Sequence, residues 1–200
     1  MITIRYAIFV LILCMGCFPH QGKAHPHVFV AQQLTTVFDA KGLAGIQVNW
    51  IFDDMFSSMI SADHDRNENG MLEPEEVQSI KANAFSFIKE FDYFSYIRID
   101  SKPFKVQYVT DFSATLDQGR LSYDFFIPCH VSATRHPKEI VVSSYDPSYY
   151  SAIYFNDKKP VDTVNGSDMD VNLKVGLDKE TSIYYDMVNP WALFFSFRLK

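Results

Sequence analysis

The chain of 200 residues is long enough for one domain with a substantial core, and 24 Asp and Glu against 18 Lys and Arg give a formal net charge of −6. This acidic balance argues against nucleic acid as a partner, because binding to phosphates is carried by Lys and Arg, and it suits the binding of cations. With 18 Phe and 11 Tyr, we expect a core built largely from aromatic side chains.

Residues 1–24 have the three parts of a secretory signal peptide. Arg5 gives a short positive start, and residues 7–18 form an apolar run that is too short to span a bilayer as a helix. The segment 22–24, Gly-Lys-Ala, places small residues at the two positions that a signal peptidase recognises. The sequence therefore predicts export to the periplasm, with cleavage after Ala24.

Two other interpretations of this N-terminal segment stay open: an uncleaved membrane anchor, and a lipoprotein in which Cys17 carries the lipid. In the cleaved form, residues 25–200 make up a single domain, with no later apolar run long enough to span a membrane. Cys129 is then the only cysteine, so it forms no internal disulfide and is expected to be a buried thiol.

Period-two hydrophobic patterns predict a β-rich chain. Residues 27–38 and 45–52 alternate in this way, and the turn Asp39–Gly42 between them predicts a hairpin. Further strands are expected at 96–100, 104–109, 112–116, 121–128, 140–145, 149–155, 171–175, 183–185 and 192–199. The expected fold class is α+β, a β-rich sandwich-like domain.

A helical insertion is expected within this domain, at about residues 53–91. Asp53 and Asp54 stand where acids favour a helix N-terminus, and an apolar face follows them up to residue 64. Pro74 suits the first turn of a second helix, and apolar residues at helical spacing extend that helix to residue 91.

Between the two predicted helices, Asp65–Glu76 matches the calcium-loop pattern D-x-[DN]-x-[DN]-G-x5-E at every fixed position. Calcium needs oxygen ligands at loop positions 1, 3 and 5, a sharp turn at the position-6 glycine, and a bidentate glutamate at position 12. The expected ligands are the side chains of Asp65, Asn67, Asn69, Glu73 and Glu76 and the backbone carbonyl of Met71. The insertion is therefore predicted to be EF-hand-like; an acidic turn between two helices is the alternative.

The predicted calcium site should be weak. Asn67 and Asn69 are neutral where many loops have Asp, and the chain has no second loop of this pattern to pair with. We expect a dissociation constant of roughly 10⁻⁵ to 10⁻³ M, in the range of extracellular sites. Such a site suits an exported protein, in which calcium is mainly structural.

His25 and His27 are the second candidate site, for nickel, cobalt, zinc or copper. Alternate residues of a strand point the same way, and imidazole binds these metals. After cleavage, His25 also offers a free α-amine. Pro26 has no backbone N–H to deprotonate, which argues against a square-planar chelate through successive backbone nitrogens.

Two histidines do not complete a metal site, so an ordinary hydrogen-bonded pair is the alternative. The candidates for completing ligands are His64, His130, His136 and Asp146. Tyr145-Asp146-Pro147 is expected to end a strand and begin a turn. The alternative interpretation of Asp146 is that its carboxylate orients a metal-bound histidine.

Three stretches carry a family resemblance: His-Pro-His-Val-Phe-Val at 25–30, Asn-Trp-Ile-Phe-Asp at 49–53 leading through the loop to 92–94, and Tyr-Asp-Pro-Ser-Tyr-Tyr at 145–150. Their order and spacing resemble the domain of unknown function 1007 family, commonly labelled as the periplasmic component of an uncharacterised ABC-type transport system. The likeness covers nearly all of the predicted mature chain and weakens beyond residue 155. It implies export and a link to divalent transition-metal transport, since relatives often sit beside nickel/cobalt permeases, and it supplies no catalytic residues.

The leading interpretation is thus a non-enzymatic periplasmic accessory protein for transition-metal transport, with a membrane permease or transport system as its partner. Calcium is structural in this interpretation, and His25 and His27 handle the transported metal. Two alternatives stay open. One is a calcium-stabilised module that binds a protein, and the other is a copper enzyme resembling the histidine-brace oxygenases, for which no third nitrogen ligand at a suitable spacing is evident.

Overall fold

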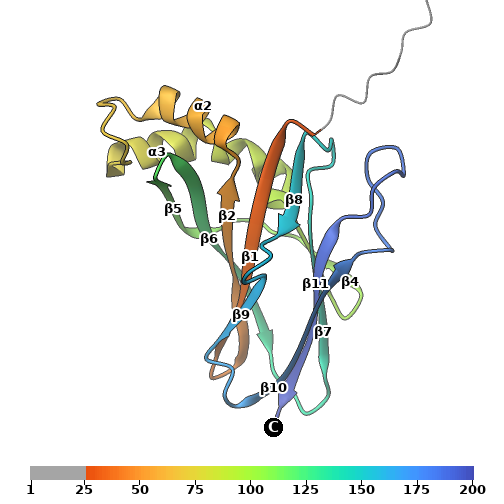
Figure 1. Cartoon of the computed structure of the whole chain (residues 1–200). Coiled ribbons are helices and arrows are strands. Elements are labelled where there is room, and N and C mark those ends of the chain that lie inside the picture. Colours follow the sequence, from red (N-terminus) through yellow and green to blue (C-terminus); the bar gives the residue numbers. More distant parts are fainter. Residues whose placement is uncertain (1–25) are drawn as a thin grey trace, which may run out of the picture.

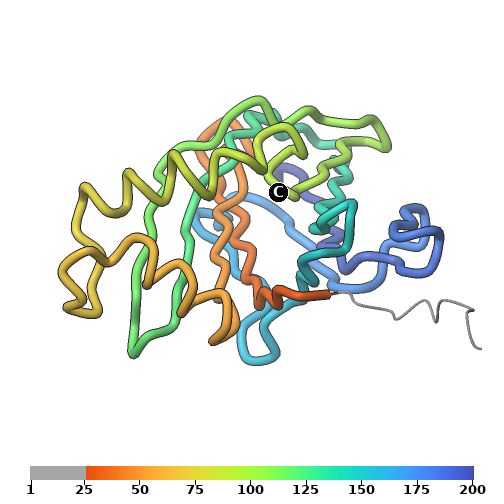
Figure 2. The backbone as a smooth tube through the Cα atoms, turned by 90° about the horizontal axis from the view of Figure 1, so that it is seen from above, coloured from red at the N-terminus to blue at the C-terminus, as the bar shows by residue number. Residues whose placement is uncertain are grey.

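A computed structural model describes residues 26–200, so the predicted signal peptide at 1–24, Cys17 and His25 lie outside the described residues. Two β-sheets face each other as a sandwich-like α+β domain, and helical elements inserted after β2 project from one end of it (Figures 1 and 2). The expected fold class is therefore confirmed at the level of a β-rich α+β sandwich.

The first sheet has six strands, in the order β5-β6-β2-β1-β8, with β9 also paired to β1. Its strands are β1 Val28–Asp39, β2 Gly42–Phe52, β5 Thr110–Asp117, β6 Arg120–Ser132, β8 Ser151–Phe155 and β9 Val161–Val164. The expected hairpin of 27–38 with 45–52 is confirmed as β1 and β2. The strands expected at 112–116 and 121–128 are β5 and β6, which pair as a second hairpin. Gln118 and Gly119 between β5 and β6 both have positive φ, as a tight hairpin turn requires.

The second sheet has five strands, in the order β10-β11-β7-β3-β4. Its strands are β3 Ser95–Ile99, β4 Lys102–Phe104, β7 Lys138–Ser144, β10 Met169–Leu177 and β11 Trp191–Leu199. Phe38 of β1 and Phe197 of β11 meet edge to face, with ring centroids 5.2 Å apart, so aromatic side chains join the two sheets as expected. Cys129 is buried, as predicted, and burial raises the pKa of its thiol to about 12.

Three helical elements form the insertion: α2 Asp54–His64, α3 Pro74–Asn83 and the 3-10 segment η1 Phe85–Phe94. The second helix therefore ends eight residues earlier than the sequence predicts, at residue 83 and not 91. The cause is tertiary packing. The ring of Phe85 lies 4.3 Å from Phe112 and 5.1 Å from Phe125 between centroids, whereas Phe87, which the helical pattern places on the apolar face, is 69% exposed.

Two predicted strands are wrong. The segment 104–109 contributes only Phe104, at the end of β4, and the segment 183–185 forms only an isolated bridge between Ile183 and Val188. Tyr184 and Tyr185 have φ of 51° and 57°, a left-handed backbone that a strand does not accommodate. In the described part of the chain, no helix is long and apolar enough to cross a membrane.

Asp53 ties the insertion to the sandwich. Its carboxylate accepts a hydrogen bond from the Phe56 backbone N–H (2.9 Å), which caps α2, and another from the Phe29 backbone N–H of β1 (2.6 Å). The Asp53 N–H in turn donates to the Phe29 carbonyl at 3.0 Å. One side chain thus satisfies a free donor of the helix start and a donor of β1 together.

Asp53→Ala is expected to lower the free energy of unfolding by about 2 kcal/mol, because both backbone donors lose their charged acceptor. Urea unfolding followed by circular dichroism measures this loss. Asp54→Ala is the matched control: its side chain is 85% exposed and pairs on the surface with Arg120, so its replacement should cost less than about 1 kcal/mol. Equal losses in the two variants would contradict the role given to Asp53.

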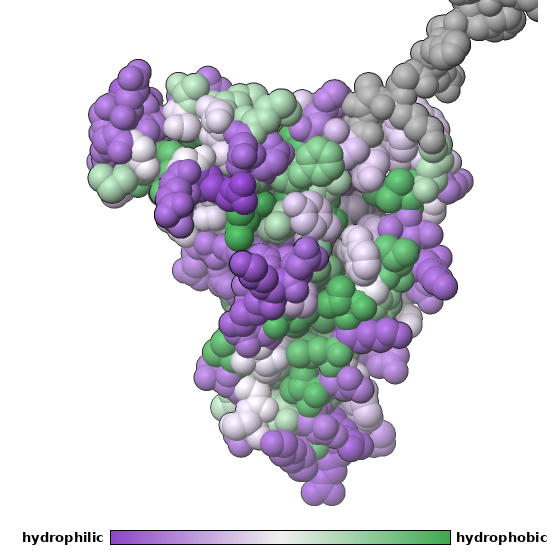
Figure 3. All heavy atoms as spheres, viewed as in Figure 1, coloured by the Kyte–Doolittle hydropathy of each residue, from purple (hydrophilic) through white to green (hydrophobic). Residues whose placement is uncertain are grey.

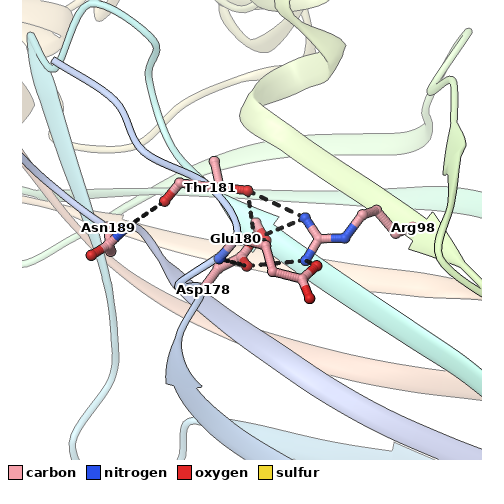
Figure 4. A network of polar contacts seen from close by, with 6 residues as sticks. Arg98, Asp178, Glu180, Thr181 and Asn189 are labelled. Atoms are coloured by element: carbon pink, nitrogen blue, oxygen red, sulfur yellow. Dashed lines mark hydrogen bonds and ion pairs between the residues drawn. The ribbon is translucent and has the colours of Figure 1, made fainter. Parts of the chain in front are cut away.

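A buried ion pair holds the loop after β10 against the second sheet (Figure 4). The Arg98 guanidinium of β3 donates to both oxygens of Asp178, at 2.9 and 3.0 Å, and Ser143 and Thr181 also donate to this carboxylate. Burial by itself raises the pKa of Asp178, but the hydrogen bonds from Arg98, Ser143 and Thr181 outweigh burial and lower that pKa to about 2.

A carboxyl whose pKa is lowered by folding stabilises the protein above its unfolded pKa of 3.8, and this stabilisation is lost as the pH falls towards 2. Asp178 is expected to account for about 2 kcal/mol of the stability lost between pH 5 and pH 2. In Asp178→Asn, the free energy of unfolding should fall by about 2 kcal/mol less than in the wild type between pH 5 and pH 2. Asp170→Asn, which removes an exposed ion pair with Arg198, should keep the wild-type slope.

Candidate functional site

The predicted calcium loop lies at the free end of the helical insertion, between α2 and α3 (Figure 1). Residues 66–71 are exposed, and this end of the molecule is hydrophilic in the space-filling view (Figure 3). Asp65 and Glu76, at the two ends of the loop, are each only 6% exposed. The loop thus has a polar rim in water and two buried carboxylates at its base.

The first half of the loop folds around the Asp65 carboxylate. Its Oδ1 accepts from the Asn69 backbone N–H at 3.2 Å, and its Oδ2 accepts from the Gly70 N–H at 2.9 Å. Gly70 has φ of 77°, a left-handed conformation that glycine adopts without strain. This is why the pattern requires glycine at loop position 6.

Glu76 closes the second half of the loop. Its Oε1 accepts from the Arg66 backbone N–H at 2.8 Å, and its Oε2 accepts from the Glu73 N–H at 3.0 Å. The second bond is half of a capping box at the start of α3, where Pro74 occupies the first turn as predicted. A single carboxylate therefore joins the beginning of the loop to the helix that follows it.

Glu73 is the most perturbed acid of the loop. Hydrogen bonding with Glu76, and then with the amides of Asn69 and Asn67, lowers its pKa to about 2. Asn69 Nδ2 donates to Glu73 Oε1 at 2.7 Å, while Glu73 Oε2 is buried and has no hydrogen-bond partner within residues 26–200. A cation would satisfy this unpartnered oxygen.

The oxygen chemistry of the loop fits a hard cation such as calcium, but its carboxylates do not converge on one point in this structure. Within residues 26–200, no group of three or more His, Cys, Asp or Glu side chains is close enough together to hold a metal ion. Both oxygens of Glu76 face backbone N–H groups, and Met71, the expected carbonyl ligand, is 61% exposed. Calcium coordination by the loop residues stays a prediction.

The histidine candidates are spread over the molecule. His25 is outside the described residues, and His27 is an exposed residue immediately before β1. The ring of His27 lies 5.0 Å from that of Tyr150 between centroids, and its backbone N–H donates to the Tyr150 carbonyl at 2.8 Å. His64 is buried at the end of α2, where its Nδ1 lies 3.0 Å from Ser79 Oγ of α3.

The remaining candidate ligands lie in three different places: in β6, in the loop before β7 and in the turn before β8. His130 is exposed within β6, and His136 is exposed in the loop before β7. Asp146 is buried, and its carboxylate accepts hydrogen bonds from Ser148 N, Ser148 Oγ and Ser151 N. These bonds support the interpretation of Asp146 as a turn-forming residue.

A cavity of about 800 Å³ lies between the insertion and the inner face of the first sheet, and sequence reasoning did not predict it. Trp50, Phe52 and Tyr123 line its floor, and Phe56, Phe85 and Phe94 of the insertion line its cover. The alternation of Trp50 with Phe52 did indicate that both face one side of β2. No local pattern indicates that the insertion leaves space above them.

Fold and insertion together define an α+β sandwich protein with a helix–loop–helix element after its second strand. Residues 10–176 match the DUF1007 family, described as "Protein of unknown function", and the chain belongs to this family. It is 30% identical over 99 residues to an "Uncharacterized 15.5 kDa protein in trpE 3'region" of Spirochaeta aurantia, a match that covers 50% of this chain and 70% of the relative. It is 27% identical over 154 residues to an "Uncharacterized protein" of Haemophilus influenzae, covering 75% of this chain and 72% of the relative.

Proposed function

We propose that this protein is an exported, periplasmic accessory protein that acts by binding and not by catalysis, and that its 65–76 loop takes calcium as a structural ion. The observation that carries the calcium proposal is the loop geometry: two buried carboxylates, Asp65 and Glu76, organise its backbone around Gly70. Export is supported by the signal-peptide pattern of residues 1–24. The neutral Asn67 and Asn69 suit a compartment where calcium is abundant.

The loop residues have defined parts in this proposal. Asp65 and Glu76 hold the two ends of the loop together, and Glu73 adds a carboxylate oxygen that has no other partner within the described chain. Calcium, when bound, supplies the positive charge that offsets these acids. Because the loop joins α2 to α3, the ion fixes the angle between the two helices.

Calcium is expected to raise the Tm by about 5 to 10 °C at a free concentration a hundred times the dissociation constant, because it binds only the folded loop. In Glu76→Gln the shift should largely disappear, since the position-12 ligand loses its charge. Thermal unfolding with calcium and with chelator measures the shift for each variant against its own calcium-free Tm. Each variant needs its own reference because the two oxygens of Glu76 accept hydrogen bonds from two backbone N–H groups, whereas glutamine has only one side-chain oxygen. The substitution therefore changes the Tm even without calcium.

Glu75→Gln is the matched control. Glu75 is exposed in the first turn of α3 and is at no ligand position, so this variant should keep the full calcium shift. An unchanged wild-type Tm in millimolar calcium would mean that the loop is an acidic turn. If calcium shifts the Tm of Glu76→Gln as much as that of the wild type, Glu76 is not a calcium ligand and the predicted ligand set is wrong.

The link to transition-metal transport is the second part of the proposal. It is supported by the family resemblance and by His27, whose exposed imidazole at the start of β1 is accessible to a metal or to a membrane permease. His25, the other predicted ligand, would share the metal with His27. Nickel, cobalt, zinc and copper all suit such a nitrogen site.

Titration of the exported protein with these four metals by calorimetry is expected to show binding that falls at least tenfold in His25→Ala/His27→Ala. Lys158→Ala changes an exposed residue that is not among the candidate ligands and should leave the affinity unchanged. Copper-dependent oxidation of a substrate would favour the enzyme alternative. Equal affinities in the wild type and the double variant would reject the histidine site and leave the calcium proposal intact.

A calcium-stabilised module that binds a protein is the alternative with structural support. Met55 and Met59 of α2 and Phe87 of η1 are 64%, 51% and 69% exposed, so the insertion presents large apolar side chains to solvent. Cross-linking in periplasmic extracts, compared between the wild type and Met55→Ser/Phe87→Ser, distinguishes this function from metal handling at His27.

A further inference from the structure

The cavity beneath the helical insertion has a sealed floor and open upper walls. On the floor, Trp50, Phe52 and Tyr123 of the first sheet are each no more than 5% exposed. In the upper walls, Met59 of α2 and Phe91 of η1 are 51% and 48% exposed. A ligand therefore meets the upper walls, which form a groove between the insertion and the turn before β8. The apolar side chains of this groove are Phe56, Met59, Ile88, Phe91, Pro147 and Tyr150.

The groove has the size and the apolar surface that a small molecule requires. The cavity to which it belongs encloses about 800 Å³, within the range of pockets that bury a drug-sized ligand. Phe56, Phe91 and Tyr150 offer aromatic surface, and the flexible side chain of Met59 adapts to the shape of what it contacts. Contact with these side chains removes apolar ligand surface from water, so the body of the ligand is apolar.

Contacts with the rest of the fold hold both sides of the groove in place. Phe56 of α2 stacks on Phe52 of β2, with ring centroids 4.7 Å apart. On the other side, the Tyr145 backbone N–H donates to the Phe94 carbonyl at 3.1 Å, which ties the turn before β8 to the end of η1. The ring of Phe94 in turn lies 6.1 Å from that of Phe91. The groove is thus built into the fold.

The charges along the groove have one sign. Asp63 and Asp146 line it, and no lysine or arginine of the described chain does. Asp63 is exposed near the end of α2, whereas Asp146 is buried and is hydrogen-bonded only by neutral groups of its own turn. His64 also lines the cavity, with its Nδ1 3.0 Å from Ser79 Oγ of α3. Two acids without a cation beside them repel an anionic ligand and attract a cationic one.

We propose that this groove binds an organic cation with an apolar body, such as an amine that carries an aromatic ring system. The body lies against Phe56, Met59 and Phe91, and the ammonium group stays at the mouth, where it pairs with Asp63. Because the ammonium group remains in contact with water there, its desolvation penalty is small. The aromatic faces of Phe91 and Tyr150 add cation–π attraction. The ligand needs no contact with the sealed floor.

The test compares three probes with one ring system: cationic 1-pyrenylmethylammonium, neutral 1-pyrenylmethanol and anionic 1-pyrenecarboxylate. Equilibrium dialysis against the purified exported protein, at one fixed millimolar calcium concentration, gives each affinity, with pyrene fluorescence reporting the bound amount. The cation is expected to bind about tenfold more tightly than the anion and about threefold more tightly than the alcohol. Added salt should reduce both differences, because it screens the charges at the mouth.

Two pairs of variants separate the charge from the apolar walls. Asp63→Asn is expected to reduce the preference for cation over anion about threefold and to leave the affinity for the alcohol unchanged. Asp157→Asn, which changes an exposed acid outside the cavity, should keep the full preference. Phe91→Ala should weaken all three probes about fivefold, since it removes part of a wall. Phe87→Ala changes a neighbouring side chain that is 69% exposed and does not line the cavity, so it should weaken none.

Circular dichroism confirms that each variant is folded. Four results would each overturn the proposal: no binding of any probe, an anion that binds as tightly as the cation, an alcohol that binds more tightly than the cation, or affinities that neither Asp63→Asn nor Phe91→Ala changes. The calcium and histidine proposals are unaffected by these results, because they are read from other variants with other ligands.

Discussion

The whole insertion depends on how one carboxylate joins it to the sandwich. Asp53 accepts from β1 through the Phe29 N–H and from α2 through the Phe56 N–H, at the point where β2 ends. A helix that leaves a strand through a flexible linker would sample many directions, whereas two hydrogen bonds to one rigid side chain allow few. The direction of α2 is therefore fixed where β2 ends. This direction determines which part of the first sheet the insertion covers.

The helix α2 serves two regions at once. Phe56, Met59 and Ile60 face the cavity, while at the C-terminal end His64 contacts Ser79 of α3 and Asp65 begins the loop. A change in the angle between α2 and α3 would thus move one wall of the cavity. The loop and the cavity are separate sites that share a structural element, which is the physical condition for energetic coupling between them.

Much of the fold could be predicted because its signals are local. The alternation of residues 27–38 and 45–52 indicated β1 and β2, and the acids at Asp53 and Asp54 and the proline at 74 indicated the starts of α2 and α3. The break of the second helix could not be predicted, since it depends on Phe85 packing against residues of β5 and β6. β9 was not predicted for a similar reason. Its four residues show no alternation of apolar and polar side chains, and they form a strand because they pair with β1.

The candidate cavity was beyond prediction because its lining residues come from several strands and from the insertion. Trp50 and Tyr123 look like ordinary core residues in the sequence, and only the register of β2 and β6 places them opposite each other. Register in turn follows from which face of each strand is buried, a property of the complete sheet.

The pairing of β1 also sets an order of assembly. Val28 of β1 lies parallel to Ser151 of β8, and Leu34 lies parallel to Val161 of β9, so the first strand borders segments more than 120 residues later in the chain. During synthesis, the outer edge of the β1–β2 hairpin stays without these neighbours until most of the polypeptide has been made. Contacts over such long separations form slowly. The chain therefore remains incompletely folded for most of its synthesis, and its last third completes the sheet that its first residues begin.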